Sequence, residues 1–273
     1  MRYAESGGPG SALAAESLGQ LVSMWKRFAG DRPNADLRDR LGLSVCWAES
    51  EFPLWNAVFL TEQIWSPEHL SARLRDASRF VRTKRQSGRV FVCEGYLNGR
   101  AKAAVDTVAM AEGFERVAVV TGMVGSMPPG GQSSRSASLR FVRVTTEEAW
   151  RAFADIYSEA NGLPLKAGLA GFGTSRLWKE TAFAYIGFVD GKAISTAAAI
   201  VDDGQIHLAL VATKLAEQCN GFGEASARHA LQAAYDATGL RRSAVHTTDA
   251  AYTLCCRIGY SPISRFFTYS GSS

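Results

Sequence analysis

Residues 208–235 constrain the fold of this chain more than any other stretch, because they read as a strand, a glycine turn and a helix. The apolar run at the start predicts a buried strand over Gln205–Thr213. Gly221 and Gly223 follow, and apolar residues at helical spacing then predict a helix that ends at Gly239. A helix that begins after a glycine loop favours an anion, because its first N–H groups are free and its dipole is positive there. The stretch therefore predicts a phosphate-binding loop.

The composition limits the class of protein. Hydrophobic residues make up 47% of the sequence and charged residues 21%, as in a globular protein, and a net charge of +4 does not by itself indicate nucleic acid. No apolar run reaches the roughly 18 residues of a membrane span, so we expect no membrane partner. Met1–Gly10 lacks the apolar core of a signal peptide, and five cysteines, an odd number, then predict reduced thiols in a cytoplasmic protein. No cysteines have C-x-x-C spacing, so we expect no metal site.

The clearest linker signal lies near the middle of the sequence. Pro-Pro and Gly-Gly are adjacent there and serines follow. We therefore predict an N-terminal domain over residues 1–124, a linker over 125–138 and a C-terminal domain over 139–273. The pattern of the first domain predicts the order strand, strand, helix, strand, helix, strand after an opening helix. That of the second predicts strand, helix, three antiparallel strands, loop, helix, strand, helix, strand.

The glycine loop of the second domain reads Gln218-Cys-Asn-Gly-Phe-Gly223. It matches the Gln/Arg-x-x-Gly-x-Gly/Ala loop of the GNAT-fold N-acetyltransferases at every specified position, so the second domain resembles that superfamily. The hairpin turns at Asp190-Gly-Lys and Asp202-Asp-Gly precede the loop, and Ile258-Gly-Tyr260 is similar to the Leu-Gly-Phe ending of the family. The first domain lacks such a loop and resembles the degenerate N-terminal copy of tandem GNAT proteins, with an unrelated α/β domain as the alternative. The resemblance implies an α/β (α+β) fold of two mixed-sheet domains.

The same resemblance implies acetyl-coenzyme A, or another acyl-coenzyme A, as co-substrate. The fold would hold its pyrophosphate on backbone N–H groups of the loop and of the start of the helix: Gln218, Cys219, Asn220, Gly221, Phe222, Gly223 and Glu224. A backbone N–H of Leu210, Val211 or Ala212 would polarise the thioester carbonyl. This strand is also expected to separate from the strand over 242–247, opening a slot for the pantetheine arm. The implied activity is acyl transfer to an amine of a small molecule, by direct attack on the thioester.

The expected proton-transfer groups depart from the family pattern. Cys255 stands where the family often has the tyrosine that protonates the leaving thiolate; it is either that acid or a small packing residue. Tyr252, one turn earlier, is a second candidate. No glutamate occurs on the strand before the loop, so the candidate bases are His207 and His246, each with a purely structural role as the alternative. Strand alternation places His207, Ala209 and Val211 on one face.

Two other functions fit the sequence. One is a GNAT-fold transferase that uses aminoacyl-tRNA, in which case a basic surface is needed; the basic run consists of Arg73, Arg75, Arg79, Arg82, Lys84 and Arg85. The other is a non-catalytic coenzyme A-binding module, which the missing tyrosine and glutamate favour. In either enzyme we expect a monomer or homodimer. We also expect aromatic residues to line an acceptor pocket between the domains, beneath a glycine-rich lid over 167–174.

Overall fold

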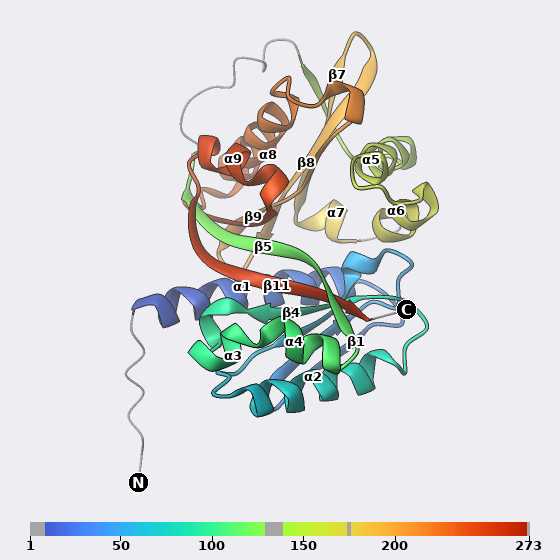
Figure 1. Cartoon of the computed structure of the whole chain (residues 1–273). Helices are drawn as coiled ribbons and strands as arrows, with labels where there is room; N and C mark the ends of the chain where they lie inside the picture. Colours follow the sequence, from blue (N-terminus) through green and yellow to red (C-terminus); the bar gives the residue numbers. More distant parts are fainter. Residues whose placement is uncertain (1–8, 129–138, 174–175, 272–273) are drawn as a thin grey trace.

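The computed structural model describes residues 9–128, 139–173 and 176–271 of the chain. Figure 1 shows two lobes, with the first half of the chain below and most of the second half above. Two long strands, β5 (Phe114–Ser126) and β11 (Ser261–Gly271), lie side by side and run from one lobe into the other. The lobes are therefore joined by hydrogen-bonded strands.

One mixed sheet runs through both lobes in the order β1-β2-β3-β4-β11-β5-β10-β9-β8-β7-β6. Its other strands are β1 (Asp36–Arg40), β2 (Leu43–Trp47), β3 (Asn56–Leu60), β4 (Arg89–Cys93), β6 (Arg140–Arg143), β7 (Ala182–Val189), β8 (Lys192–Asp202), β9 (Gln205–Thr213) and β10 (Arg242–Thr248). The α-helices are α1 (Pro9–Gly30), α2 (Pro67–Val81), α3 (Gly99–Ala103), α4 (Val105–Ala111), α5 (Glu147–Ala160), α6 (Leu165–Phe172), α7 (Leu177–Glu180), α8 (Phe222–Thr238) and α9 (Asp249–Ile258).

The two halves repeat one topology and exchange their last strands. In the first half, β3 pairs parallel with β4 across α2; in the second, β9 pairs parallel with β10 across α8. Each half then ends in a long antiparallel strand, and the last strand of the other half is inserted beside it: β11 lies between β4 and β5, and β5 lies between β10 and β11. The division into domains at residues 124 and 139 stays a prediction, and most of the expected linker lies outside the described residues.

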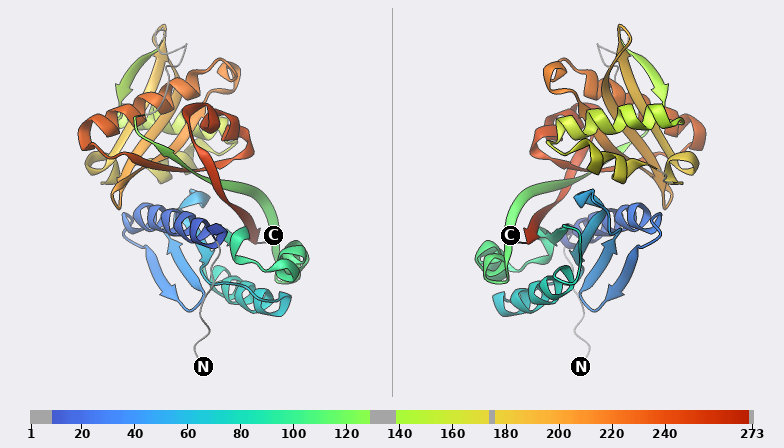
Figure 2. Two further views of the ribbon diagram at one scale, coloured as in Figure 1. Left: turned by 90° about the vertical axis from the view of Figure 1, so that its left-hand side faces the viewer. Right: turned by 90° about the vertical axis from the view of Figure 1, so that its right-hand side faces the viewer.

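Helices cover both faces of the sheet in each lobe. In the lower lobe, α1 lies on the face toward the junction of the lobes and α2 to α4 lie on the other face (Figure 1). In the upper lobe, α8 and α9 lie on one side and α5 and α6 on the other, as the two views of Figure 2 also show. The largest apolar cluster includes buried residues of α1, β2 to β4, α5 and β7 to β9, so it is continuous from lobe to lobe.

Three details of the fold differ from the sequence pattern. The strand β1 was not expected, because its charged sequence Asp-Leu-Arg-Asp-Arg lacks an apolar face and it lies at the exposed edge of the sheet. The one helix expected between the last two strands of the first domain is broken at Ala104 into α3 and α4. Most of the glycine-rich segment over 167–174 is helical and belongs to α6, where Gly171 lets the helix pack on Phe52: a Cβ there would lie 2.7 Å from the phenyl Cγ. Its role as a lid stays a prediction, and Thr174 lies outside the described residues.

Candidate active site

The strands β9 and β10 separate in the middle of the upper lobe. They pair in parallel only from Ser243 and Ile206 to Val245 and Leu208. Beyond that point β9 continues to Thr213 and β10 continues to Thr248 without further pairing. The expected separation is thus confirmed. A gap between two parallel strands exposes backbone groups to whatever enters it, because each strand has lost a neighbour.

A bulge in β9 lies just beyond this point. Ala209 is opposite Ala198 of β8 and Ala212 is opposite Thr196, so β9 carries an extra residue between them. Leu210 has a left-handed backbone with φ of 55°, and neither it nor Val211 has a partner in the register of the adjacent strands. Ala212, in contrast, is back in the ladder with β8. A bulge releases backbone groups from the ladder and redirects side chains. Leu210 and Val211 therefore lie outside the ladder at the gap, and the Leu210 carbonyl accepts a hydrogen bond from the Thr196 hydroxyl at 3.0 Å.

The bulge also reverses the alternation of side chains. Ala209 and Leu210 both pack against the cluster beneath α5, whereas Val211 packs against the cluster beneath α8. The prediction that Val211 shares a face with His207 was therefore wrong. A single inserted residue shifts the two-residue period of a strand, and nothing in the apolar sequence of β9 marks where that insertion falls.

A cavity of about 150 Å³ occupies the gap. Among the predicted residues it is lined by Leu210, Val211, His246 and Cys255. Tyr157 of α5 and Asn161, which follows it, also line this cavity, and neither was singled out in the sequence. Tyr157 lies on α5 and Asn161 directly follows this helix, about 50 residues before β9. Helical spacing alone did not indicate that the two side chains reach the gap.

The glycine loop ends at the start of α8. Gly221 has a φ of 82°, precedes the first helical residue and accepts a hydrogen bond from the Ala225 N–H at 3.1 Å. Within the described chain, the N–H groups of Phe222, Gly223 and Glu224 have no hydrogen-bond partner, and no side chain caps the helix. Gly223 lies against β9, where a Cβ would be 3.0 Å from the Thr213 hydroxyl oxygen. The two glycines thus have separate roles, one in the turn and one in the contact of α8 with β9.

The rest of the loop is open to solvent. Gln218, Cys219 and Asn220 are exposed, and Cys219 has a left-handed backbone with φ of 62°. The side-chain amides bond only within the loop: Gln218 Nε2 donates to the Thr213 carbonyl and Asn220 Nδ2 to the Glu217 carbonyl, both at 3.3 Å. These contacts hold the loop in a compact turn between β9 and α8.

Glu224 in the first turn of α8 does not leave a free negative charge there. Its carboxylate accepts hydrogen bonds from Arg228 Nε at 3.0 Å and from Arg257 Nε at 2.7 Å. Burial opposes ionisation, but the two arginines outweigh it and lower the pKa of the carboxyl. A charge paired in this way repels an incoming anion much less than a free carboxylate would. The predicted contact with a pyrophosphate therefore concerns the backbone N–H of Glu224 and not its side chain.

The matching helix of the first half is built differently. At the start of α2 the Ser66 hydroxyl accepts from the His69 N–H at 3.2 Å, and Pro67 has no N–H to offer. The carboxylate of Glu62 lies at this end and accepts from His69 Nε2 at 2.9 Å. The strands β3 and β4 pair from Ala57 to Leu60, the last residue of β3, so no gap opens between them. Only the second half combines a gap with an uncapped helix start.

A larger cavity of about 460 Å³ lies where the lobes meet. From the first half it is lined by α1, β4, β5 and the turn before β3; from the second, by Tyr157, by β9 and β10, and by Thr268 of β11. It shares Tyr157, Leu210 and His246 with the smaller cavity, so the two meet at those side chains. Of the aromatic residues expected around an acceptor pocket, Trp55 lines the cavity, whereas Phe172 and Trp178 are in the buried core.

His246 is held in one tautomer by α1. Its Nε2 lies 3.1 Å from the Ser17 carbonyl oxygen and 3.1 Å from the Ser17 hydroxyl. A carbonyl oxygen can only accept, so Nε2 carries the proton and Nδ1 holds the lone pair. Within the described residues Nδ1 has no hydrogen-bond partner. The ring therefore offers one acceptor at the junction of the two cavities.

Both strand histidines are held neutral. Burial and, to a lesser extent, the nearby His207 together lower the pKa of His246 to about 3. Burial likewise lowers the pKa of His207 to about 4. His207 is 2% exposed, lines the larger cavity, and its Nε2 has no partner in the described chain. Both rings are thus available as hydrogen-bond acceptors or donors in their uncharged form.

The candidate acids lie in different places. Cys255 lines the smaller cavity, and burial raises the pKa of its thiol to about 11. Tyr252 lines neither cavity and packs at the edge of the cluster beneath α8. Tyr157 lines both cavities, burial raises the pKa of its phenol to about 12, and its hydroxyl has no partner among the described residues. Tyr157 is the better placed phenol.

The basic run of the first half is partly neutralised. Arg73 pairs with Glu62, Arg75 with Glu112 at 2.8 Å, and Lys84 with Asp36 at 2.8 Å. These pairs offset part of the positive charge of the run, and the alternative of an aminoacyl-tRNA donor stays a prediction. Across the described ranges no three His, Cys, Asp or Glu side chains gather as a metal site, and no helix is long and apolar enough to cross a bilayer.

Solved structures share this arrangement over almost the whole chain. Protein-family models and curated protein sequences give no match. A GCN5-related N-acetyltransferase from Kribbella flavida has a TM-score of 0.69 at 15% identity, over 94% of this chain and 96% of that chain. One from Sphaerobacter thermophilus has a TM-score of 0.58 at 12% identity, over 96% and 93%. A tandem GNAT protein from the clavulanic acid biosynthesis pathway has a TM-score of 0.56 at 11% identity, over 94% of each chain.

The chain has a tandem GNAT fold. The GNAT topology accounts for the exchange of β5 and β11, because each half supplies the strand that completes the sheet of the other. Within this tandem fold the halves differ in the features that concern a ligand. The second has the gap, the bulge and the uncapped helix, and the first has a continuous parallel pair and a capped helix.

The exposed thiol in the loop allows a direct test of the prediction that coenzyme A binds there. We expect iodoacetamide to alkylate Cys219 and Cys256, which are exposed, and not the buried Cys46, Cys93 and Cys255, whose pKa values burial raises to about 12, 11 and 11. Saturating acetyl-coenzyme A, which has no free thiol to consume the reagent, should slow the alkylation of Cys219 by about tenfold or more, since ligand and reagent compete for one loop. Cys256 on α9 is the internal control. Equal rates at Cys219 with and without the ligand, measured by peptide mass spectrometry, would contradict this placement.

Proposed function

We propose that the chain is an N-acyltransferase that transfers an acyl group, in the simplest case acetyl, from an acyl-coenzyme A to an amine of a small molecule. The observation that carries the proposal is the gap between β9 and β10, next to a helix start whose N–H groups have no partner in the described chain. Free N–H groups at a helix start suit a pyrophosphate, and the gap suits a narrow chain that must reach the strands. Structures of similar fold described as N-acetyltransferases, and one determined without AcCoA, support it.

The residues around the gap suit the steps of this reaction. A backbone N–H of Leu210 or Val211 would polarise the thioester carbonyl. The acceptor nitrogen would approach from the larger cavity and donate to Nδ1 of His246, which takes its proton as the carbon–nitrogen bond forms. As the carbon–sulfur bond breaks, the phenol of Tyr157 would protonate the departing thiolate. Cys255 would then be a packing residue at the wall of the slot.

The role of Tyr157 gives a specific expectation. Tyr157→Phe should lower kcat about 10- to 100-fold, because the thiolate then leaves without a proton donor, while the dissociation constant for acetyl-coenzyme A stays the same. The stability of the fold should not fall, since the hydroxyl has no partner within the described residues. Tyr185→Phe, on β7 and outside both cavities, is the matched control. An unchanged kcat in Tyr157→Phe would remove this residue from the chemistry.

Thiol release separates an enzyme from a non-catalytic coenzyme A-binding module. Purified protein, acetyl-coenzyme A and a panel of primary amines are combined, and free coenzyme A thiol is measured with a chromogenic disulfide. We expect at least one amine to raise thiol release above the rate of hydrolysis. Saturable binding of acetyl-coenzyme A with no amine-dependent release across a broad panel favours the module.

A further inference from the structure

The larger cavity combines aromatic walls with a single permanent charge. Trp25 and Phe28 of α1, Trp55 before β3 and Phe91 of β4 line it, with Phe28 stacked on Trp55 at 4.0 Å between ring centroids. Among the described residues that line the cavity there is no aspartate or glutamate, and Arg89 is the one lysine or arginine. A volume of about 460 Å³ is that of a small-molecule site.

Arg89 has no counter-ion in the described chain. It is half-buried at the start of β4, and its Nη1 donates to the Gly88 carbonyl at 3.3 Å. Burial lowers the pKa of the guanidinium, and no neighbouring charge offsets that effect. A desolvated guanidinium without an anion is unfavourable, because it has lost water and gained no partner. This arrangement becomes favourable when an anion enters the cavity.

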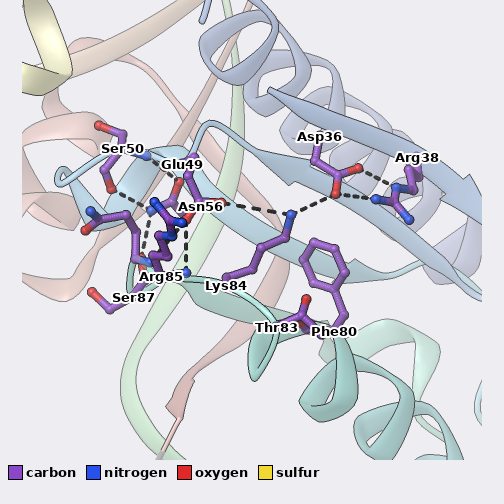
Figure 3. A network of polar contacts seen from close by, with 11 residues as sticks. Asp36, Arg38, Glu49, Ser50, Asn56, Phe80, Thr83, Lys84, Arg85 and Ser87 are labelled. Atoms are coloured by element: carbon purple, nitrogen blue, oxygen red, sulfur yellow. Dashed lines mark hydrogen bonds and ion pairs between the residues drawn. The ribbon is translucent and has the colours of Figure 1, made fainter. Parts of the chain in front are cut away.

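The acidic residues next to β4 are already engaged (Figure 3). Glu49 accepts from the Arg85 and Gln86 N–H groups at 3.0 and 3.2 Å, and its second oxygen lies 3.9 Å from Lys84 Nζ. Asp36 pairs with the same lysine at 2.8 Å. Because these carboxylates fix the segment that leads into β4, they position Arg89 without neutralising it.

Two residues that line the cavity carry further donors without partners. Trp25 Nε1 and the Thr268 hydroxyl are buried and have no hydrogen bond to any described residue. Trp25 packs against Phe91 with 5.6 Å between ring centroids, and Thr268 is opposite Phe91 in the register of β4 and β11. Arg89 is two residues from Phe91 and so shares its face of the strand. An indole N–H can only donate, so the group that satisfies this cluster must accept.

We propose that the larger cavity binds a carboxylate-bearing molecule with an aromatic or apolar body, its carboxylate held by Arg89, Thr268 and Trp25. That this molecule is the acyl acceptor rests on the proposed function; the carboxylate site does not. The residues paired with β5 indicate how the ligand is oriented. Thr268 is opposite Ala118, whereas His246 is opposite Gly122, further along the same strand. Four residues of a strand span about 13 Å, so the amine and the carboxylate lie at opposite ends of the acceptor.

The test compares two probes of nearly the same shape, one a charged carboxylate and the other a neutral amide. Calorimetric titration of the full chain, with no acyl donor present, uses 4-phenylbutyrate and its neutral amide, 4-phenylbutyramide. We expect the acid to bind at least about tenfold more tightly than the amide. Arg89→Met should abolish that preference and Arg89→Lys should keep part of it, whereas Arg140→Met on the edge strand β6 should leave it intact.

Equal affinity for acid and amide in the unmodified chain would overturn the proposal, and so would an undiminished preference in a folded Arg89→Met protein. If Arg89→Met does not fold, partial loss of the preference in Arg89→Lys supports the carboxylate site and full retention there contradicts it. Binding of the acid by a chain that fails to bind acetyl-coenzyme A supports the carboxylate site and removes its assignment to an acyl acceptor. The two proposals therefore fail separately.

Discussion

Replacing Gly221 with valine is expected to weaken the binding of acetyl-coenzyme A by about 10- to 100-fold. The glycine precedes α8 with a φ of 82°, a conformation that costs a β-branched residue on the order of 1–3 kcal/mol. The chain can relieve that strain only by moving the turn. The turn aims the N–H groups of Phe222, Gly223 and Glu224, so their convergence on the pyrophosphate is lost. Calorimetric titration measures the change.

Gly204→Val is the matched control for this variant. Gly204 also has a left-handed backbone, with φ of 69°, in the hairpin turn between β8 and β9, and a Cβ there would have no neighbour within 4 Å. The two substitutions impose similar local strain, but only one lies in the loop. We expect both proteins to lose some stability and only Gly221→Val to lose affinity. An equal loss of affinity in both variants would mean that general destabilisation, and not the loop, explains the result.

His246→Ala is expected to lower kcat by about 100-fold or more, with little change in the affinity for acetyl-coenzyme A. The substitution removes the acceptor that Ser17 fixes at the junction of the two cavities. His229→Ala is the control, because His229 stacks on Phe141 of β6 and lines neither cavity. Initial rates with the best amine of the panel decide between them. A similar kcat in both variants would leave His246 with a structural role only.

The lowered pKa values of the two strand histidines lead to expectations for how the rate and the stability depend on pH. His246 and His207, with pKa values of about 3 and 4, stay neutral in the folded chain through the range near 6.5 where free histidine titrates. The pH–rate profile of the unmodified chain should therefore have no limb near pH 6.5 that is lost in His246→Ala. Stability should fall as the pH drops from about 6.5 toward 4, because the unfolded chain then binds protons that the folded chain does not. A limb near 6.5 that disappears in His246→Ala would contradict the burial of this ring.

The local parts of the site could be predicted from the sequence. The strand, the turn at Gly221 and the helix after it follow from apolar periodicity and from the left-handed turn, which act over a few residues. The separation of β9 from β10 was expected from the resemblance. The position of the bulge was not, and with it the face of Val211 was wrong, since β9 is apolar on both sides and its sequence does not distinguish one register from the next.

The non-local parts could not be predicted, because they depend on which strands become neighbours. The insertion of β11 beside β4 brings Thr268 to Phe91, and hence close to Arg89, although these residues are almost 180 positions apart. Tyr157 reaches the slot because α5 packs on β8 and β9, a contact that helical periodicity does not specify. The sequence contains 30 lysines and arginines, and its pattern does not distinguish Arg89 from the others. Its partial burial without a paired carboxylate is seen in the structure and not in the sequence.

The stoichiometry and affinity of acetyl-coenzyme A on the unmodified chain test the central claim most directly. Among the residues that the structure describes, only those of the second half combine a gap between parallel strands with an uncapped helix start after the first of them. Calorimetric titration should therefore give saturable binding of one molecule per chain, and Gly221→Val should weaken that binding event. No binding at millimolar ligand, or two equivalent molecules per chain, would contradict the account.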